Sequence, residues 1–132
     1  MATNTLPIVG SFYGPQRGSP SKALIAALSV GTPLFLIAEP DNPADPNAVA
    51  VYVESAHIPV AGHPLLEEAL PEFGFTVEQI LDQDAWHLGY VPKEMAAKLK
   101  AQGVVGDDPV PVTFSTSANG APRVRSVEPF DV

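Results

Sequence analysis

The stretch Glu39-Pro40-Asp41-Asn42-Pro43-Ala44-Asp45-Pro46-Asn47-Ala48-Val49-Ala50-Val51 decides how the rest of the chain is interpreted. It begins as a polar cluster with three prolines and ends as a short apolar run. Asp and Asn side chains fold back on their own backbone and proline fixes φ, so the first part predicts a rigid turn. The apolar run predicts a strand. A rigid polar loop beside a strand can hold a ligand, and it can equally be a well-made turn.

Length and composition fit one small domain. A chain of 132 residues with 45% hydrophobic residues is large enough for one core, and its 15 prolines favour short strands over a helical bundle. The absence of cysteine excludes a disulfide framework and thiolate metal sites. The N-terminus lacks a signal-peptide pattern, and no apolar run has the length of a membrane span. We therefore expect a soluble, intracellular protein of the cytoplasm.

Apolar runs bounded by turn residues predict six strands and a few short helices. The strands are expected at residues 6–13, 33–38, 48–53, 86–91, 110–116 and 123–130. The second of these is nearly all apolar, which predicts a central strand buried on both faces. Helices are expected at residues 21–28, closed by Gly31, and at 92–102, with Pro92 in the first turn. Asn119-Gly120 predicts a hairpin between the last two strands.

The acidic residues are concentrated in one segment. The net charge is −8, but residues 54–85 hold seven acids and no Lys or Arg, while the remainder holds eight acids and seven bases. A negative charge disfavours nucleic-acid binding, because contacts with phosphates dominate that affinity. Since the charge is confined to one segment, the rest of the domain is close to neutral.

The same segment also carries apolar residues at helical spacing. Val77, Ile80 and Leu81 suit one face of a short helix, and Leu66 and Leu70 suit a second. We expect a helical insertion that docks through these residues and turns its acids outward. It is either a decorated loop with a solvated face or a lid or partner surface.

Side chains arranged for catalysis are scarce. The chain has no cysteine nucleophile and no glycine-rich phosphate loop, and His57, His63 and His87 lack the i, i+4 spacing of a zinc helix. A cluster of His57 and His63 with Asp82 or Asp84 has irregular spacing for a metal. We expect no enzymatic activity, no metal and no cofactor.

Three collinear blocks resemble the HIRAN domain family. The opening stretch is similar to the pattern E-P-D-N-P-x-D-x-N-A-V-A-V, residues 8–13 (Ile-Val-Gly-Ser-Phe-Tyr) to V-x-G-x-x-Y, and residues 88–96 to a G-Y-V-P-x-x-x-A strand-to-helix junction. The blocks span residues 6 to about 102. The resemblance implies a mainly β fold, a small OB- or SH3-like barrel, in a single domain over residues 1–132 with the acidic helical insertion at about 54–85. It also implies a domain that grips single-stranded DNA, especially a free 3′ end.

The resemblance gives roles to residues of the first two blocks. Tyr13 falls where the family has an aromatic that stacks on a base, and Asp45 falls on the acid that accepts a hydrogen bond from a terminal 3′-hydroxyl. Asn42 and Asn47 would shape the loop, with Asn42 the preferred contact. The alternatives are a core tyrosine and ordinary turn hydrogen bonds.

The third block supplies the phosphate side of the expected site. Tyr90 and Lys93 flank Pro92 at a helix start, where free N–H groups and the helix dipole favour a phosphate. Lys98 and Lys100 would extend the basic track. The alternative is an ordinary solvated helix face.

Two positions depart from the family pattern. Ala44 replaces an aromatic that many members carry, and Phe12 stands where some members have an arginine. With the acidic insertion, these changes predict weaker DNA binding than that of a typical member, unless other bases share the face. The candidates for such compensation are Arg17, Lys22, Arg123 and Arg125.

Two functions therefore stay open. One is a non-catalytic module that binds single-stranded DNA 3′ ends. The other is a protein-interaction or inhibitory module that binds a protein partner through residues 54–85, for instance as a nucleic-acid mimic. An open groove rimmed by Lys or Arg favours the first function, and a groove covered by residues 54–85 favours the second.

Overall fold

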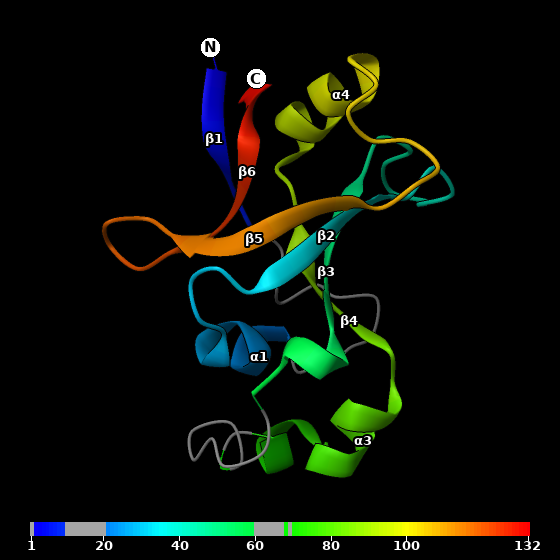
Figure 1. Cartoon of the computed structure of the whole chain (residues 1–132). Coiled ribbons are helices and arrows are strands. Elements are labelled where there is room, and N and C mark those ends of the chain that lie inside the picture. Colours follow the sequence, from blue (N-terminus) through cyan, green and yellow to red (C-terminus); the bar gives the residue numbers. More distant parts are fainter. Residues whose placement is uncertain (1, 10–20, 60–67, 69) are drawn as a thin grey trace.

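The structure is a computed structural model that describes residues 2–9, 21–59, 68 and 70–132. It is mainly β, as the sequence predicts, with a few short helices (Figure 1). The strands are β1 (Ala2–Pro7), β2 (Pro33–Ala38), β3 (Val49–Glu54), β4 (Ala85–Tyr90), β5 (Val110–Thr116) and β6 (Pro122–Asp131). The helices are α1 (Ser21–Ala27), the 3-10 turns η2 (Ser55–His57) and η3 (Leu70–Phe73), α3 (Val77–Asp82) and α4 (Lys93–Ala101).

The six strands form one sheet in the order β1-β6-β5-β2-β3-β4, and every ladder is antiparallel. The sheet is not closed into a barrel by these ladders, so the expected OB- or SH3-like closure is not confirmed. Beyond the end of β1, Val9 forms an isolated antiparallel bridge with Tyr90 of β4. The two outer strands are therefore brought together at this point.

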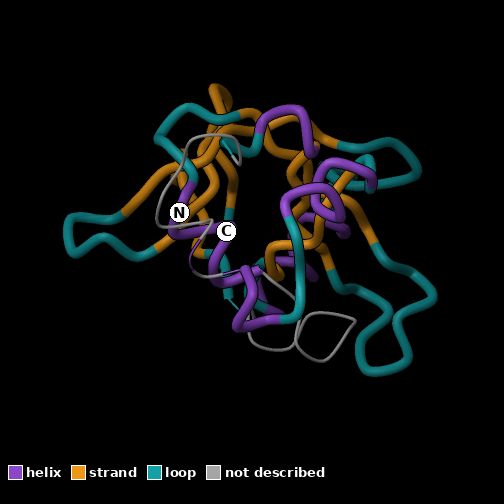
Figure 2. The backbone as a smooth tube through the Cα atoms, turned by 90° about the horizontal axis from the view of Figure 1, so that it is seen from below, coloured by secondary structure: helices purple, strands orange, loops and turns teal. Residues whose placement is uncertain are grey.

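The first strand begins earlier than the sequence predicts. β1 pairs with β6 from Ala2↔Asp131 onward, so the chain termini lie side by side (Figure 1). Residues 10–13 of the predicted strand lie outside the described residues. The hairpin joining β5 to β6 is confirmed, with Gly120 at φ +84°, and both views show it extending from the rest of the chain (Figures 1 and 2). A positive φ suits glycine because it has no Cβ.

β2 is a central strand, but the prediction that both of its faces are buried is wrong. Leu34 and Leu36 are fully buried, whereas Phe35 and Ile37 are only partly buried. An antiparallel sheet commonly packs one face on the core and leaves the other nearer to water. The apolar run reflects its central place in the sheet, between β5 and β3.

The insertion after β3 docks on the sheet, as expected, although not through every predicted residue. The side chain of Ile80 is fully buried, and Val77 packs against the core, but Leu81 is 50% exposed. The indole Nε1 of Trp86 in β4 donates to the carbonyl of Ile80 at 2.8 Å, and the Phe75 ring meets the Trp86 ring edge-on at 5.5 Å. The prediction is thus confirmed for Ile80 and wrong for Leu81.

The rest of the insertion is described only in part. Leu70 begins the 3-10 turn η3 instead of lying in an α-helix, and it is buried. Residue 66, its predicted partner, lies outside the described residues. In α3, Thr76 and Gln79 form a capping box, which fixes where the helix begins. The acids Glu78, Asp82 and Asp84 are exposed.

The elements that carry the predicted site lie at one end of the molecule. Figure 1 shows α4 and the β2–β3 connection at one end and α1 and α3 at the other. Pro92 is the N-cap of α4, in an extended conformation with ψ 140°, and not a residue of its first turn. Across the described parts of the chain, no helix has both the length and the apolar character required to span a membrane.

Candidate functional site

The β2–β3 connection, residues 39–47, is held by its own side chains. Glu39 N–H donates to the Ala48 carbonyl at 2.9 Å, which closes the loop. The Asn42 Oδ1 accepts from the backbone N–H groups of Ala44 and Asp45, at 2.9 and 3.1 Å. Asn42 therefore makes the turn-forming bonds that the local reading of the sequence predicts.

Asp45 makes a similar local bond. Its Oδ1 accepts from the backbone N–H of Asn47 at 2.9 Å, and its carbonyl accepts from Ala48 N–H at 3.1 Å. An ionised carboxylate has about four acceptor sites, so this bond leaves Asp45 with capacity for a ligand donor. The side chain is partly buried.

Tyr90 connects this loop to β4. Its pKa is raised to about 12, first by burial, then by a hydrogen bond to the Glu39 side chain and by the negative charge of Glu39. A hydrogen bond with the Asn42 side chain acts in the opposite direction. The Glu39 Oε1 also accepts from the Asn42 Nδ2 at 3.0 Å. Glu39, Asn42 and Tyr90 thus form one hydrogen-bonded group.

A bulge in β4 places Tyr90 against the ring of His87, which in turn meets the ring of Tyr52. Tyr52 of β3 pairs with His87, but Val51 pairs with Gly89, so Leu88 is an extra residue. Residues three apart in a regular strand point to opposite faces, whereas here the rings of His87 and Tyr90 lie 4.7 Å apart, and His87 meets Tyr52 at 5.4 Å. The bulge therefore creates the aromatic wall behind Tyr90.

Burial shifts the pKa values of two residues in this aromatic wall, His87 and Tyr52. It lowers the pKa of His87 below the usual value, and the negative charge of Glu39 works in the opposite direction. It also raises the pKa of Tyr52, with Glu39 adding to that shift. The imidazole is therefore held in its neutral form near neutral pH.

Four predicted site residues line one groove, here called the Asp45 groove. It has a volume of about 370 Å³ and is lined by Val9, Asn42, Ala44, Asp45, Ala48, Tyr90, Val91 and Lys93. A neighbouring depression of about 800 Å³, here called the Glu39 hollow, is lined by Ala38, Glu39, Pro40, Asp41, Asn42, Pro43, Ala44 and Tyr90. Asn42, Ala44 and Tyr90 border both. The structure thus brings Asn42 and Asp45 of the loop together with Tyr90 and Lys93 of the strand-to-helix junction, two separate parts of the sequence.

The structure describes only one of the two remaining predicted site residues. Tyr13 lies outside the described residues, although Val9, the last described residue before it, lines the Asp45 groove. Lys98 is on α4, and its Nζ donates to the carbonyl of Val132 at 3.3 Å. Lys98 therefore lies toward the C-terminus of the chain.

Lys93 and Lys100 have different places around the loop. Lys93 is the exposed first residue of α4, beside the N–H groups that a helix leaves without intrahelical partners. Lys100 Nζ donates to the Pro46 carbonyl at 2.8 Å, so it ties the loop to α4. The sequence suggests Lys100 as part of a phosphate track, and the structure shows an anchor of the loop.

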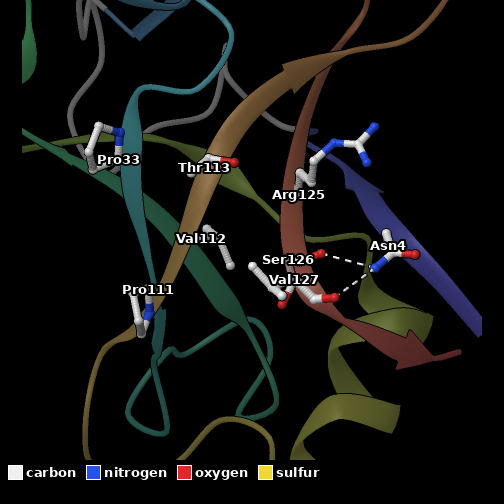
Figure 3. Close-up of a pocket in the computed structure, with 8 residues that line it drawn as sticks. All are labelled: Asn4, Pro33, Pro111, Val112, Thr113, Arg125, Ser126 and Val127. Carbon is white, nitrogen blue, oxygen red and sulfur yellow. Dashed lines mark hydrogen bonds between the residues drawn. The ribbon is translucent and has the colours of Figure 1, made fainter.

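The bases considered as compensation do not line the Asp45 groove where they are described. Arg125 lines a different hollow of about 670 Å³ along β1, β6, β5 and β2, together with the 98% exposed Val127 (Figure 3). In this hollow Asn4 Nδ2 donates to the carbonyls of Ser126 and Val127, at 3.0 and 3.2 Å. Arg123 donates to the side chain and carbonyl of Thr5. Residue 17 lies outside the described part of the chain.

The acidic insertion does not contribute to the groove in the part of it that the structure describes. None of the described residues between 54 and 85 lines the Asp45 groove or the Glu39 hollow. α3 lies at the opposite end of the molecule from α4 (Figure 1). These residues leave the groove open, with Lys93 on its rim.

This arrangement defines a class: a small, mainly β domain whose polar loop, strand end and helix start surround one groove. A comparison with models of protein families matches residues 6–102 to the HIRAN domain. The chain therefore belongs to the HIRAN domain family, and the resemblance drawn from the sequence is confirmed. Neither the curated proteins nor the solved structures give a match. Family membership indicates a nucleic-acid-binding module, of a kind that is generally non-catalytic on its own.

Residues beyond the family match complete the sheet. β5 and β6 follow residue 102, yet they lie between β1 and β2 in the strand order. Without them β1 would have no ladder partner among the described strands. The C-terminal hairpin is therefore an integral part of the sheet.

Proposed function

We propose that this protein binds single-stranded DNA at a free 3′ end and does no chemistry on it. The observation that carries the proposal is the convergence of Asn42, Asp45, Tyr90 and Lys93 on the Asp45 groove. The two pairs, Asn42 with Asp45 and Tyr90 with Lys93, are far apart in the sequence, and all four residues match positions to which the family resemblance gives a role. A groove that combines an acceptor with a cation suits a nucleotide with a terminal hydroxyl.

The two charged groups of the groove, Asp45 and Lys93, determine the direction in which a DNA strand would lie in it. Asp45 can accept a hydrogen bond from a 3′-hydroxyl but repels a terminal phosphate. Lys93 and the N–H groups at the start of α4 can hold an internal phosphate. A strand therefore fits best when its last sugar lies at Asp45 and its backbone runs toward Lys93.

Ala44 explains why binding should be modest. It is exposed and borders both the Asp45 groove and the Glu39 hollow, so an aromatic side chain at this position would be placed to stack on a base. Alanine offers no such surface. Base stacking contributes on the order of 1–3 kcal/mol per base, so its loss reduces affinity substantially.

The proposal is tested by comparing two ends of the same strand. Fluorescence anisotropy at low salt is measured with a 5′-labelled oligonucleotide that ends in a 3′-hydroxyl or a 3′-phosphate. We expect tighter binding of the hydroxyl end. Asp45→Asn keeps an Oδ1 acceptor for the Asn47 N–H but removes the charge, so it should erase the preference by improving binding of the phosphate end.

Asp41→Asn is the matched control, because Asp41 is an exposed acid of the same loop that does not line the Asp45 groove. It should keep the preference for the hydroxyl end. Equal binding of both ends by the wild-type protein would contradict the 3′-end proposal. No binding to either would leave the protein-interaction function through residues 54–85 as the better explanation.

The acidic insertion is best tested by neutralising charges. A deletion of residues 57–84 would remove the buried side chains of Ile58, Leu70 and Ile80 from the core. Replacing the exposed acids Glu78, Asp82 and Asp84 by their amides leaves these buried side chains in place. If their charge only repels DNA at long range, this triple variant binds more tightly at low salt and like the wild type at high salt.

A further inference from the structure

Glu39 is the centre of the hydrogen-bonded group beside the Asp45 groove. It follows the last residue of β2, and both its backbone and its side chain contact Asn42. The Glu39 carbonyl accepts from Asn42 N–H at 3.0 Å, and the Glu39 Oε1 accepts from Asn42 Nδ2 at 3.0 Å. Asn42 is therefore held at two points by one residue.

The side-chain bond decides which way the Asn42 amide faces. Because Nδ2 donates to Glu39, Oδ1 is turned toward the loop, where it accepts from Ala44 and Asp45. An amide rotated by half a turn would present its NH₂ group to those two N–H donors and lose both bonds. The Glu39 carboxylate thus fixes the conformation of the backbone that carries Asp45.

The same carboxylate also contacts Tyr90 on the other side of the groove. Glu39 and Tyr90 line the same hollow, and the Glu39 side chain raises the pKa of Tyr90 as a hydrogen-bond partner and through its negative charge. Glu39 therefore bridges the loop and β4, which otherwise reach the groove from different parts of the sequence. It is partly buried and lines the Glu39 hollow, not the Asp45 groove.

We infer that Glu39 is a positioning residue, which holds Asn42 and Tyr90 in place so that Asp45 faces a 3′-terminal nucleotide. This inference rests on the proposed function. An acid close to a DNA-binding groove repels phosphates, so its charge alone would weaken binding. Glu39 favours binding through the hydrogen bonds that its side chain accepts. Substitution can separate this effect from the effect of its charge.

Two substitutions separate them. Glu39→Gln keeps an acceptor oxygen for Asn42 and loses the charge, whereas Glu39→Ala loses both. For a positioning role we expect Glu39→Gln to bind the 3′-hydroxyl strand as tightly as the wild type or more tightly. Glu39→Ala should bind roughly 3- to 10-fold more weakly, as the loss of one or two hydrogen bonds implies. It should also show a smaller preference for the hydroxyl end.

Glu128→Ala is the control for net charge, because Glu128 is an exposed acid on β6 that lines neither depression. If Glu39 acted only through its charge, Glu39→Ala, Glu39→Gln and Glu128→Ala would all bind slightly more tightly than the wild type. That outcome would overturn the inference. Circular dichroism melts of each variant establish that the fold is intact.

A second readout does not depend on DNA. The ionisation of Tyr90 is followed by ultraviolet absorbance at high pH, as the difference between each protein and its Tyr90→Phe counterpart. We expect the high pKa of Tyr90 to fall toward the ordinary tyrosine value in both Glu39 variants, because the charge of Glu39 is absent from each. An unchanged titration would refute the contact itself.

The two readouts also distinguish the two proposals. If the wild-type protein binds no DNA but the Tyr90 titration shifts, the contact exists and the DNA function fails, and the positioning role fails with it. If the wild type prefers the hydroxyl end and Glu39→Ala matches it, only the role of Glu39 is refuted.

Discussion

Val9 and Tyr90 exchange both backbone hydrogen bonds of an antiparallel pair, at 2.8 and 2.7 Å. They belong to chain segments next to β1 and within β4, the two outer strands of the sheet. The bridge forms one wall of the Asp45 groove, since both residues line it.

Lys93→Ala should weaken binding of both the hydroxyl and the phosphate end. Loss of one phosphate contact on a single strand should reduce the slope of log K against log salt by about 0.7. The measurement is anisotropy across a salt series. Lys98→Ala is the control on the same helix, because Lys98 contacts the C-terminal carbonyl and does not line the groove. An equal loss of slope in both variants would show that the helix as a whole, and not the groove, meets the DNA.

Ala44→Tyr should strengthen binding to single-stranded DNA. The new ring borders the Asp45 groove and the Glu39 hollow and supplies a stacking surface, so affinity should rise by roughly 5- to 150-fold, or about 1–3 kcal/mol. Ala118→Tyr, in the exposed β5–β6 hairpin, controls for a general effect of an added aromatic. A gain of equal size at Ala118 would argue against stacking in the groove.

His87→Phe should make stability less sensitive to mild acid. Burial lowers the pKa of His87 in the folded state, so the unfolded chain binds a proton more readily. The stability contributed by the neutral imidazole is therefore complete above the unfolded value of about 6.5 and is lost as the pH falls toward the lower folded pKa. Thermal melts between pH 7.5 and 5 should show a smaller decrease for His87→Phe than for the wild type. His57→Phe, at an exposed position, should leave the decrease unchanged.

Ile80→Ala should destabilise the fold, whereas Leu81→Ala should not. Ile80 is fully buried against the sheet and Leu81 is 50% exposed, although they are neighbours on α3. Truncation of a buried isoleucine costs about 2–5 kcal/mol, and an exposed leucine costs far less. Urea unfolding followed by Trp86 fluorescence measures both. Equal midpoints would mean that the insertion does not dock as the structure shows.

The local structure of this protein follows largely from its sequence. The bounds of β2 and β5 are those predicted, and Asn119-Gly120 forms the predicted hairpin, because proline, glycine and apolar runs act over a few residues. The turn bonds of Asn42 and Asp45 are local in the same way. The family was also identifiable, because its three blocks are continuous motifs.

The tertiary structure decided what no local pattern contains. The order of the strands places the C-terminal hairpin in the middle of the sheet, and the bulge at Leu88 turns His87 and Tyr90 to the same side. Lys98 and Lys100 lie two residues apart on α4, and the packing of the helix sets one against the C-terminus and the other against the loop. Contacts between distant residues depend on how whole elements pack, which a single sequence does not specify position by position.

Glu39 makes one contact that the local sequence determines and one that depends on the tertiary structure. It stands first in the E-P-D-N-P motif, where the sequence marks it only as a residue of a polar turn. Its bond to Asn42 spans three residues and is local, but its interaction with Tyr90 crosses from the β2–β3 connection to β4. The sequence by itself determined the rigid loop, the mainly β class and the family. Only the packing of the sheet decided that this loop meets Tyr90 and Lys93 around one groove, because their separation along the chain is closed by strand pairing and not by local backbone preferences.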